Sequence, residues 1–257
     1  MGVVNVTPDS FSDGGLYTST ESAIRHAARL IAEGADLLDI GGESTRPGAA
    51  SVSTAEELRR VIPVVQALVS RNMNTPVSVD TSKPEVMRAA IAAGAAMIND
   101  VNALQAPGAL EAVAKGNAAA CLMHRQGEPR DMQHNPQYQN VVAEVKDFLQ
   151  QRLDAAQTAG IPLERLVIDP GFGFGKTLGH NLELLRQLDS FTDMGVPVLA
   201  GLSRKSMLGK ITGNEVGNRV HASVAAALLA ATKGARILRV HDVKATWDAL
   251  AVYNAVY

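Results

Sequence analysis

Short apolar runs alternate with amphipathic segments along the whole chain. The runs lie at Gly2–Val6, Asp36–Ile40, Pro76–Val79, Ala95–Ile98, Ala118–Met123, Leu166–Ile168, Val196–Ala200 and Ala235–Val240. Runs without polar alternation are typical of buried strands in a parallel sheet. Between them, apolar side chains recur at helical spacing, as at Ile24, Ala27, Ala28 and Ile31. Eight such strands alternating with helices predict an α/β protein, a single (β/α)8 TIM barrel over residues 1–257.

An open doubly wound sheet is the main alternative for this alternation. The turn after the first strand carries no dinucleotide-binding glycine fingerprint, which favours the barrel. Two long polar loops follow the first and second strands, at Thr7–Ser19 and Gly41–Ser53. They contain few large apolar side chains to offset the entropy cost of ordering. We therefore expect both loops to be mobile until a ligand binds.

Composition narrows the classes of partner. The formal net charge is −2 and there is no basic run, so nucleic acid and membrane surfaces are not expected partners. Cys121 is the only cysteine, which excludes an intramolecular disulfide. The first residues lack the pattern of a secretory signal, and no run is long enough for a membrane helix. A cytoplasmic location is the expectation.

Nearly every predicted strand ends in a polar or charged residue. These residues are Asn5, Asp39, Asp80, Asn99 with Asp100, His124, Asp169, the run Ser203–Ser206, and Arg239 with His241. Strand ends are often polar only because loops are polar. A complete ring of such residues is costly to bury without a ligand, and the carboxyl ends of barrel strands carry the active site.

The ring divides into acceptors and cations. Asp80, Asn99 and Asp169 suit a flat heterocycle that bears amino groups and ring N–H, and no His or Glu stands beside them at metal-ligand spacing. Lys205 and Arg239 belong to the last two strands, where barrels often bind phosphate.

Three further features bear on the site. Ser206 lies near a helix start, which favours an anion, whereas Arg46 alone is equally consistent with a solvated loop charge. The segment Asp169–Thr177 fails the phosphate-loop pattern because Pro170 stands where its first glycine is required. Its glycines instead suit a close approach of backbone to a flat ligand, with Phe172 or Phe174 as an apolar wall.

The chain resembles dihydropteroate synthase, a folate-pathway enzyme family, at motifs spread over its whole length. The matching segments are Asn5–Gly15 (NVTPDSFSDGG), Gly41–Gly48 (GGESTRPG), Ser78–Pro84 (SVDTSKP), Ile98–Asp100 (IND), Met123-His124, Asp169–Lys176 (DPGFGFGK), Ser203–Ser206 (SRKS) and Arg239–Val243 (RVHDV). The resemblance implies condensation of 6-hydroxymethyl-7,8-dihydropterin pyrophosphate with p-aminobenzoate to 7,8-dihydropteroate. It also implies release of pyrophosphate by early C–O cleavage, a need for Mg²⁺, and competitive inhibition by sulfonamides.

Residue roles follow from the same resemblance. The implied pterin side comprises Asp80, Asn99, Met123, Asp169, Lys205 and Arg239. The implied p-aminobenzoate side comprises Phe11, Asp13, Thr45, Pro47, Phe174 and Ser206. Pyrophosphate is implied to contact Thr45, Arg46, Arg239 and His241, and Mg²⁺ to contact Asn5. Catalytic roles are implied for Asp13, Asp80, Asp169, Lys205 and Arg239.

Two rival functions share part of this pattern. A methyltransferase that passes a methyl group from methyltetrahydrofolate to a corrinoid protein has the same kind of pterin site, and a non-catalytic pterin-binding barrel needs no turnover. The cations near the last strands favour a pyrophosphate leaving group. The chain departs from the family in starting its first strand at Gly2 and in carrying Arg125, for which a surface charge is expected. The alanine-rich stretch Ala222–Thr232 predicts a homodimer, unless those alanines face the barrel.

Overall fold

In the described part of the chain, eight parallel strands form the centre of the protein. The computed structural model describes residues 1–6, 16–44, 51–71, 75–127, 132 and 135–257. Six strands form one sheet in sequence order: β1 (Gly2–Asn5), β2 (Leu38–Gly41), β3 (Val77–Asp80), β4 (Met97–Asp100), β5 (Ala119–Met123) and β6 (Leu166–Asp169). The remaining two, β7 (Leu199–Ala200) and β8 (Ile237–Leu238), form a parallel pair.

Two further contacts close these sheets into a barrel. Ile168 at β6 bridges to Val198 beside β7, and Gly2 in β1 bridges to Val240 beyond β8. The second junction is held by a hydrogen bond of 2.9 Å from Val240 N to Met1 O. The predicted eight-stranded barrel is therefore confirmed, with each expected strand in its place.

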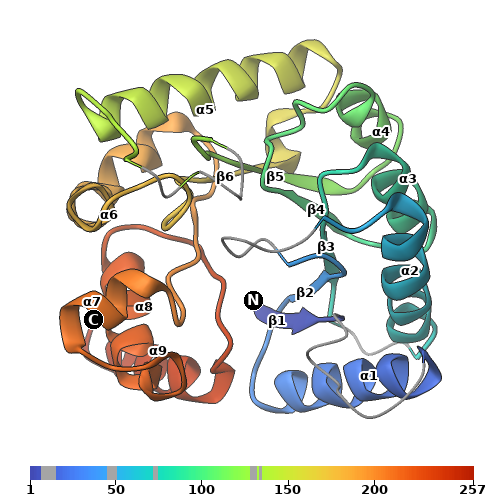
Figure 1. The fold of residues 1–257 in the computed structure, drawn as a ribbon, viewed down its shortest axis with the longest axis horizontal. Coiled ribbons are helices and arrows are strands. Elements are labelled where there is room, and N and C mark those ends of the chain that lie inside the picture. Colours follow the sequence, from blue (N-terminus) through green and yellow to red (C-terminus); the bar gives the residue numbers. More distant parts are fainter. Residues whose placement is uncertain (7–15, 45–50, 72–74, 128–131, 133–134) are drawn as a thin grey trace.

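Helices surround the strands on the outside (Figure 1). They are α1 (Leu16–Ala32), α2 (Thr54–Ser70), α3 (Pro84–Ala92), α4 (Ala109–Ala114), α5 (Val141–Thr158), α6 (Leu178–Arg186), α7 (Ser206–Thr212), α8 (Val220–Thr232) and α9 (Val243–Val256). Short 3-10 helices lie at Leu163–Arg165, Leu188–Met194 and Val216–Asn218. Local capping starts several helices; Ser53 caps α2 by accepting a hydrogen bond from Glu56 N. Among the described helices, none has the length and apolar character needed to cross a membrane.

Strand residues alternate between two environments. Outward side chains pack against the helices in the main core, among them Val4, Ile40, Val79, Ile98, Leu122 and Ile168. Inward side chains fill the barrel with a second apolar cluster of Met97, Cys121, Val167 and Leu199. Cys121 is a free, buried thiol, as expected for a strand residue. The apolar cluster occupies the inner positions that precede Asn99 and Asp169, so the polar inward residues collect toward the carboxyl end of the barrel.

Four strands, β2, β3, β4 and β6, end later than their apolar runs indicated, whereas β1 and β8 end earlier. Asp80 and Asp169 are the last residues of β3 and β6, because each continues the backbone ladder while its side chain faces inward. Asp39 does not stand at a strand end, contrary to the expectation above. It lies inside β2, which continues to Gly41.

Candidate active site

Arg239 lies just beyond β8 and binds two carboxylates across the barrel interior. Its Nε donates to Asp39 Oδ2 at 2.6 Å, and its Nη2 donates to Asp80 Oδ2 at 2.9 Å. Asp39 Oδ2 also accepts a hydrogen bond of 3.1 Å from Asn99 Nδ2. One buried oxygen of β2 therefore orients both the guanidinium of Arg239 and the amide of Asn99.

Burial and the neighbouring charges change the titration of this group. Burial raises the pKa of Asp80 to about 7; Arg239 acts against that rise, and Asp39 adds to it. Burial lowers the pKa of Arg239, but the charges of Asp39 and Asp80 outweigh burial and raise it. Arg239 is thus a permanent cation, whereas Asp80 changes charge near neutral pH.

Asp169 and Lys205 form the next part of the site. Gly171 N donates to Asp169 Oδ1 at 2.7 Å, so this hydrogen bond does not use the second carboxylate oxygen, Oδ2. Lys205 Nζ donates to Phe172 O and lies 4.6 Å from the centre of the Phe174 ring. Burial lowers the pKa of Lys205 to about 8, while the charge of Asp169 acts to raise it. Burial raises the pKa of Asp169, and Lys205 opposes that rise.

The glycine-rich segment after β6 is fitted tightly against the end of β5. Gly171 has φ +71°, and a Cβ there would stand 1.8 Å from His124 O. Lys176 stabilises the same turn. Its Nζ donates to Gly171 O at 2.9 Å and to Phe174 O at 3.0 Å, and it contacts His124 Nδ1 at 2.9 Å. The glycines therefore allow backbone to approach backbone in this turn.

Of the two phenylalanines expected as an apolar wall, only one fits that role. Phe172 is fully buried in the main core, so it does not line the site. Phe174 is partly exposed beside Lys205. His124 is a packed, neutral residue. Its ring lies edge-on against Phe148. Burial, and after it the charge of Lys176, lowers the pKa of His124 to about 3.

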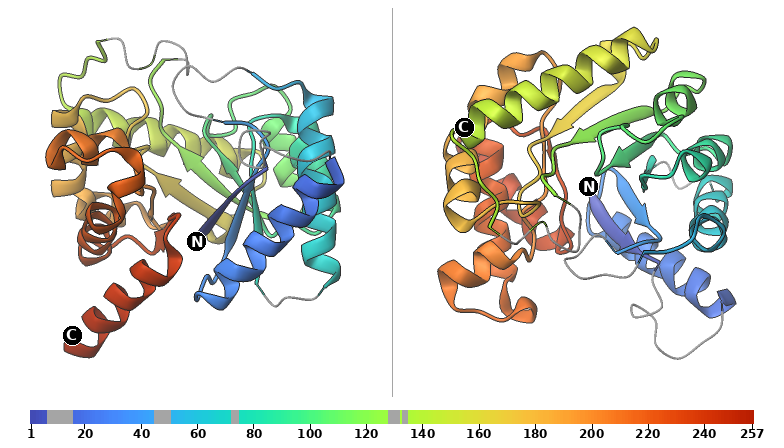
Figure 2. Two further views of the ribbon diagram at one scale, coloured as in Figure 1. Left: turned by 60° about the horizontal axis from the view of Figure 1, so that its bottom comes forward. Right: turned by 45° about the horizontal axis from the view of Figure 1, so that its top comes forward.

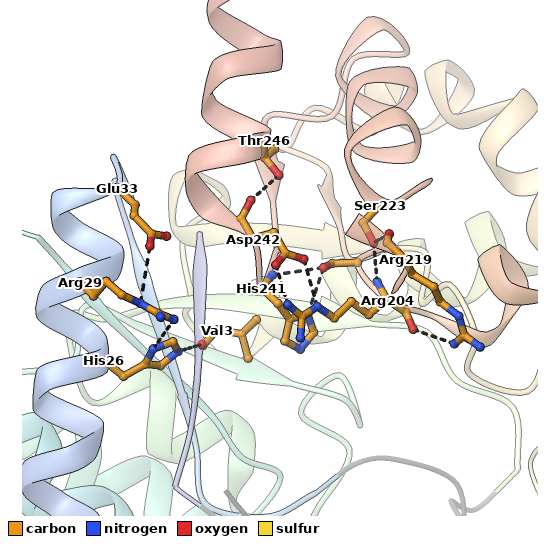
Figure 3. Close-up of polar contacts among 11 residues, drawn as sticks. Val3, His26, Arg29, Glu33, Arg204, Arg219, Ser223, His241, Asp242 and Thr246 are labelled. Atoms are coloured by element: carbon orange, nitrogen blue, oxygen red, sulfur yellow. Dashed lines mark hydrogen bonds and ion pairs between the residues drawn. The ribbon is translucent and has the colours of Figure 1, made fainter. Parts of the chain in front are cut away.

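His241 lies in the segment that follows β8 (Figure 3). Ser203 contacts both its ring and its backbone. Ser203 Oγ accepts a hydrogen bond of 3.2 Å from His241 N and contacts His241 Nδ1 at 3.0 Å. These two contacts fix the orientation of the His241 ring relative to its own backbone. Ser206 is the exposed first residue of α7, as the sequence predicted.

Oxygen donors suitable for a divalent cation gather at the end of β1. A Cβ on Gly41 would lie 3.8 Å from Asn5 Oδ1 and 3.9 Å from Asp80 Oδ2, so both oxygens face the same space. The described residues contain no group of three His, Cys, Asp or Glu side chains able to enclose a metal. Mg²⁺ commonly keeps several waters and uses one or two protein oxygens plus substrate phosphates, so a sparse oxygen set fits it.

The structure brings together most of the residues selected from the sequence. Met123 is buried beside Asp169 in the register of β5 and β6. The selected residues that lie outside the described part of the chain are Phe11, Asp13, Thr45, Arg46 and Pro47. The expected mobile loops contain residues 7–15 and 45–50, which are outside it as well.

Three contributors to the site were given no role in the sequence analysis, although two of them belong to the polar residues noted at the strand ends. They are Asp39, Lys176 and Ser203. Each acts through another residue, so none has a ligand-binding pattern of its own. An Asp inside an otherwise apolar strand was the one available signal, because such a charge requires a buried partner.

Comparison with known proteins identifies the family. The model of the pterin binding enzyme family matches residues 1–241. A dihydropteroate synthase of Escherichia coli is 51% identical over 99% of this chain and 90% of that protein. A Xanthomonas albilineans dihydropteroate synthase with 4-aminobenzoic acid has a TM-score of 0.94, at 61% identity over 100% of this chain and 92% of that one.

A second structure of a Xanthomonas albilineans dihydropteroate synthase is in complex with 7,8-dihydropteroate. It has a TM-score of 0.91, at 57% identity over 100% of this chain and 92% of that one. Inward carboxylates, an amide and paired cations at the carboxyl end of the barrel agree with this likeness. The chain belongs to the pterin binding enzyme family.

Proposed function

We propose that the protein catalyses the dihydropteroate synthase reaction. It joins 6-hydroxymethyl-7,8-dihydropterin pyrophosphate to p-aminobenzoate, and it releases 7,8-dihydropteroate and pyrophosphate. The observation that carries this proposal is the arrangement of buried acceptors, Asp80, Asn99 and Asp169, around the cations Lys205 and Arg239. Its relatives with full-length similarity are dihydropteroate synthases, which favours this reaction over methyl transfer or simple pterin binding.

In the proposed complex the pterin binds by its polar edge. Asp80 and Asp169 accept hydrogen bonds from its amino group and ring N–H groups, and Asn99 completes this edge. Lys205 donates to the pterin carbonyl and ring nitrogen, for which a partly buried amine is suited. Asp39 and Asp80 fix the orientation of the Arg239 guanidinium, which stacks on the ring system.

The leaving pyrophosphate occupies the cationic side. His241 and Arg239 contact it, together with Thr45 and Arg46. Asn5 would help to hold Mg²⁺, which would supply further stabilisation of the charge on the leaving pyrophosphate. Placing fixed cations where negative charge grows lowers the barrier to C–O cleavage.

Bond cleavage precedes bond formation in this mechanism. The C–O bond breaks with both electrons going to pyrophosphate, and the pterin ring delocalises the resulting cation, which Asp169 and Asp13 stabilise. The aniline nitrogen of p-aminobenzoate then attacks the methylene carbon, forms the C–N bond and loses one proton. Phe11, Pro47, Phe174 and Ser206 form the p-aminobenzoate side. The protein holds and orients both substrates and supplies no nucleophile.

The direct test measures pyrophosphate release from the pterin substrate with and without p-aminobenzoate. We expect release to depend on Mg²⁺, with stoichiometric dihydropteroate when p-aminobenzoate is present. Absence of both products under saturating substrates would refute the proposal.

Sulfonamides offer a test of the p-aminobenzoate side alone. They carry an aniline and an acidic group at similar separation, so we expect inhibition that is competitive against p-aminobenzoate. Inhibition that is uncompetitive, or none, would place the aniline elsewhere than beside Phe174 and Ser206.

The proposal extends to assembly as a cytoplasmic homodimer, with residues 1–257 acting as one domain. Within the stretch Ala222–Thr232, Ala226, Ala227 and Ala230 are buried, so part of it faces the barrel. Large apolar side chains are exposed on α8 and α9, at Leu229, Trp247, Val252 and Val256. Figure 2 shows α9 extending away from the strands. Light scattering at micromolar concentration tests this, and a monomer would contradict it.

A further inference from the structure

Three consecutive residues after β7 reach three different partners. Ser203 contacts His241, Arg204 binds Asp242, and Lys205 donates to Phe172 O. The middle residue, Arg204, joins the segment after β7 to the segment after β8 (Figure 3).

The backbone at Arg204 is held in an uncommon conformation. Its φ is +59°, a left-handed value that L-residues other than Gly, Asn and Asp rarely adopt. Arg204 N donates to Ser223 Oγ at 2.9 Å, and Arg204 O accepts from Arg219 Nη1 at 3.2 Å. Ser223 Oγ in turn donates to Arg219 O at 2.6 Å. The first turn of α8 therefore braces this turn from outside.

The Arg204 side chain makes a bidentate ion pair. Its Nε donates to Asp242 Oδ2 at 3.0 Å and its Nη2 to Asp242 Oδ1 at 2.5 Å. Asp242 immediately follows His241 and precedes α9, and its carbonyl accepts from Thr246 N at 3.1 Å. A fork of two parallel hydrogen bonds fixes the angle as well as the distance between its partners.

This ion pair lies beside a short stretch of backbone pairing in the barrel. β7 and β8 contribute only two residues each, paired as Leu199 with Ile237 and Ala200 with Leu238. Val198 O accepts from Arg236 N and Ile237 N before this pairing, and a hydrogen bond of 3.0 Å from Arg239 N to Ala200 O follows it. Beyond it, side chains join the two segments: Ser203 to His241 and Arg204 to Asp242.

We infer that the Arg204–Asp242 ion pair is a positioning device, which sets the separation and angle between Lys205 on the pterin side and His241 on the pyrophosphate side. The inference rests on the proposed function. In the substrate, pterin and pyrophosphate are joined by a single methylene group, so both halves must be held in register at once. Loss of the pair leaves each half-site able to bind its fragment but misaligns them for the joined substrate.

The test measures, in three variants, the binding of the two separate fragments and the turnover of the joined substrate. Arg204→Asn removes the guanidinium yet tolerates the left-handed backbone. Asp242→Asn removes the charge at constant shape, and Arg204→Lys keeps the charge but loses the fork. Lys244→Gln, which breaks the exposed Lys244–Asp248 pair on the same helix α9, is the matched control.

Binding of 6-hydroxymethylpterin alone and of pyrophosphate alone is expected to stay within about threefold of wild type in every variant. kcat/KM for the pterin pyrophosphate should fall about 10- to 100-fold in Arg204→Asn, since displacements near 1 Å can cost that much. Arg204→Lys should lose less, and the Lys244→Gln control should match wild type.

Two results would overturn the inference. One is kcat/KM within twofold of wild type in all three variants; the other is parallel loss of both fragments with a lowered Tm, which indicates a structural role only. Failure of the proposed function is distinguishable, because wild type itself would then release no pyrophosphate from the pterin substrate.

Discussion

On the acceptor side of the site, Asp39, Asp80 and Asn99 project directly from β2, β3 and β4, whereas Lys205 and His241 come from segments that follow β7 and β8. The acceptor side chains are placed by strand register: Asp80 pairs with Asn99, and Asp39 with Ser78. The cationic side chains are placed by turns and by contacts such as Ser203 with His241.

The two sides should therefore respond differently to substitution: one through the loss of a functional group, the other through the displacement of one. Replacing an acceptor leaves the backbone ladder intact, so the lost function is that of the replaced group. On the cationic side, a residue that touches no substrate can still move one that does. Substitutions that keep the fold should therefore be most damaging on the acceptor side, and graded on the cationic side.

The largest expected effect is from Asp169→Asn, with Asp80→Asn close to it. In Asp169→Asn the amide oxygen keeps the hydrogen bond from Gly171 N, so Nδ2 faces the N–H groups of the pterin. Unpaired buried donors cost about 1–3 kcal/mol, more when a charge is involved, so kcat/KM should fall by more than about 100-fold. Steady-state kinetics and circular dichroism measure activity and fold, with exposed Asp36→Asn as control. Activity near wild type would remove the residue from the pterin site.

Asp39 should give the next largest effect. Asp39→Ala leaves Arg239 Nε and Asn99 Nδ2 without their acceptor, and we expect kcat/KM to fall about 10- to 100-fold with a lower Tm. Asp39→Asn can keep both hydrogen bonds, because the amide nitrogen can take the place of Asp39 Oδ1, which has no hydrogen-bond partner among the described residues. Equal damage from both variants would show that charge matters more than the hydrogen bonds.

The pH dependence of kcat/KM should also change in Asp39→Asn. Asp80, whose pKa is raised to about 7, faces Arg239, Asp39, Glu57 and Asp100. Asp80 must be ionised to accept two N–H groups, so kcat/KM should rise with pH through about 7. Asp39→Asn removes a neighbouring negative charge, which favours ionisation of Asp80 and shifts this rise to lower pH. An unshifted profile in Asp39→Asn would assign the rise to another group.

Lys176→Met should have a moderate effect that falls on the p-aminobenzoate side. The substitution removes the donor to Gly171 O and Phe174 O, so the turn that carries Phe174 loosens. We expect about a tenfold rise in KM for p-aminobenzoate and a smaller change in KM for the pterin substrate. Exposed Lys210→Met is the control. A fall in Tm with unchanged KM values would limit Lys176 to stability.

The smallest expected effect is from Gly173→Ala. Gly173 has φ +79°, and an added Cβ would lie 3.2 Å from Lys205 Cδ. The backbone cost is about 1–2 kcal/mol of stability, and Lys205 should shift enough to lower kcat/KM by less than about tenfold. Gly160→Ala is a matched control, because its φ is +93° but nothing lies within 4 Å of the added Cβ. Equal activity in the two variants would contradict crowding of Lys205.

Much of the acceptor side could be predicted from the sequence. Asp80, Asn99 and Asp169 follow or end apolar runs, and parallel strands bring such positions to one end of the barrel. Strand boundaries were predicted less well, because polar residues such as Asp80 continue the ladder when their side chains face inward. At β2, β3, β4 and β6 the apolar run ends before the strand does, whereas at β1 and β8 it ends after the strand.

The sequence alone determined the alternation of eight buried strands with helices, and with it the barrel and the end at which polar residues meet. These are properties of local pattern, since burial on both faces of a strand is visible in its own residues. Only the tertiary structure decided which residues hold the site together. Asp39 and Arg239 are 200 positions apart, and Lys176 reaches His124 across 52. Closure of the barrel brings such partners together. The local sequence pattern cannot predict these contacts, because their energy depends on burial by segments that are distant in the sequence.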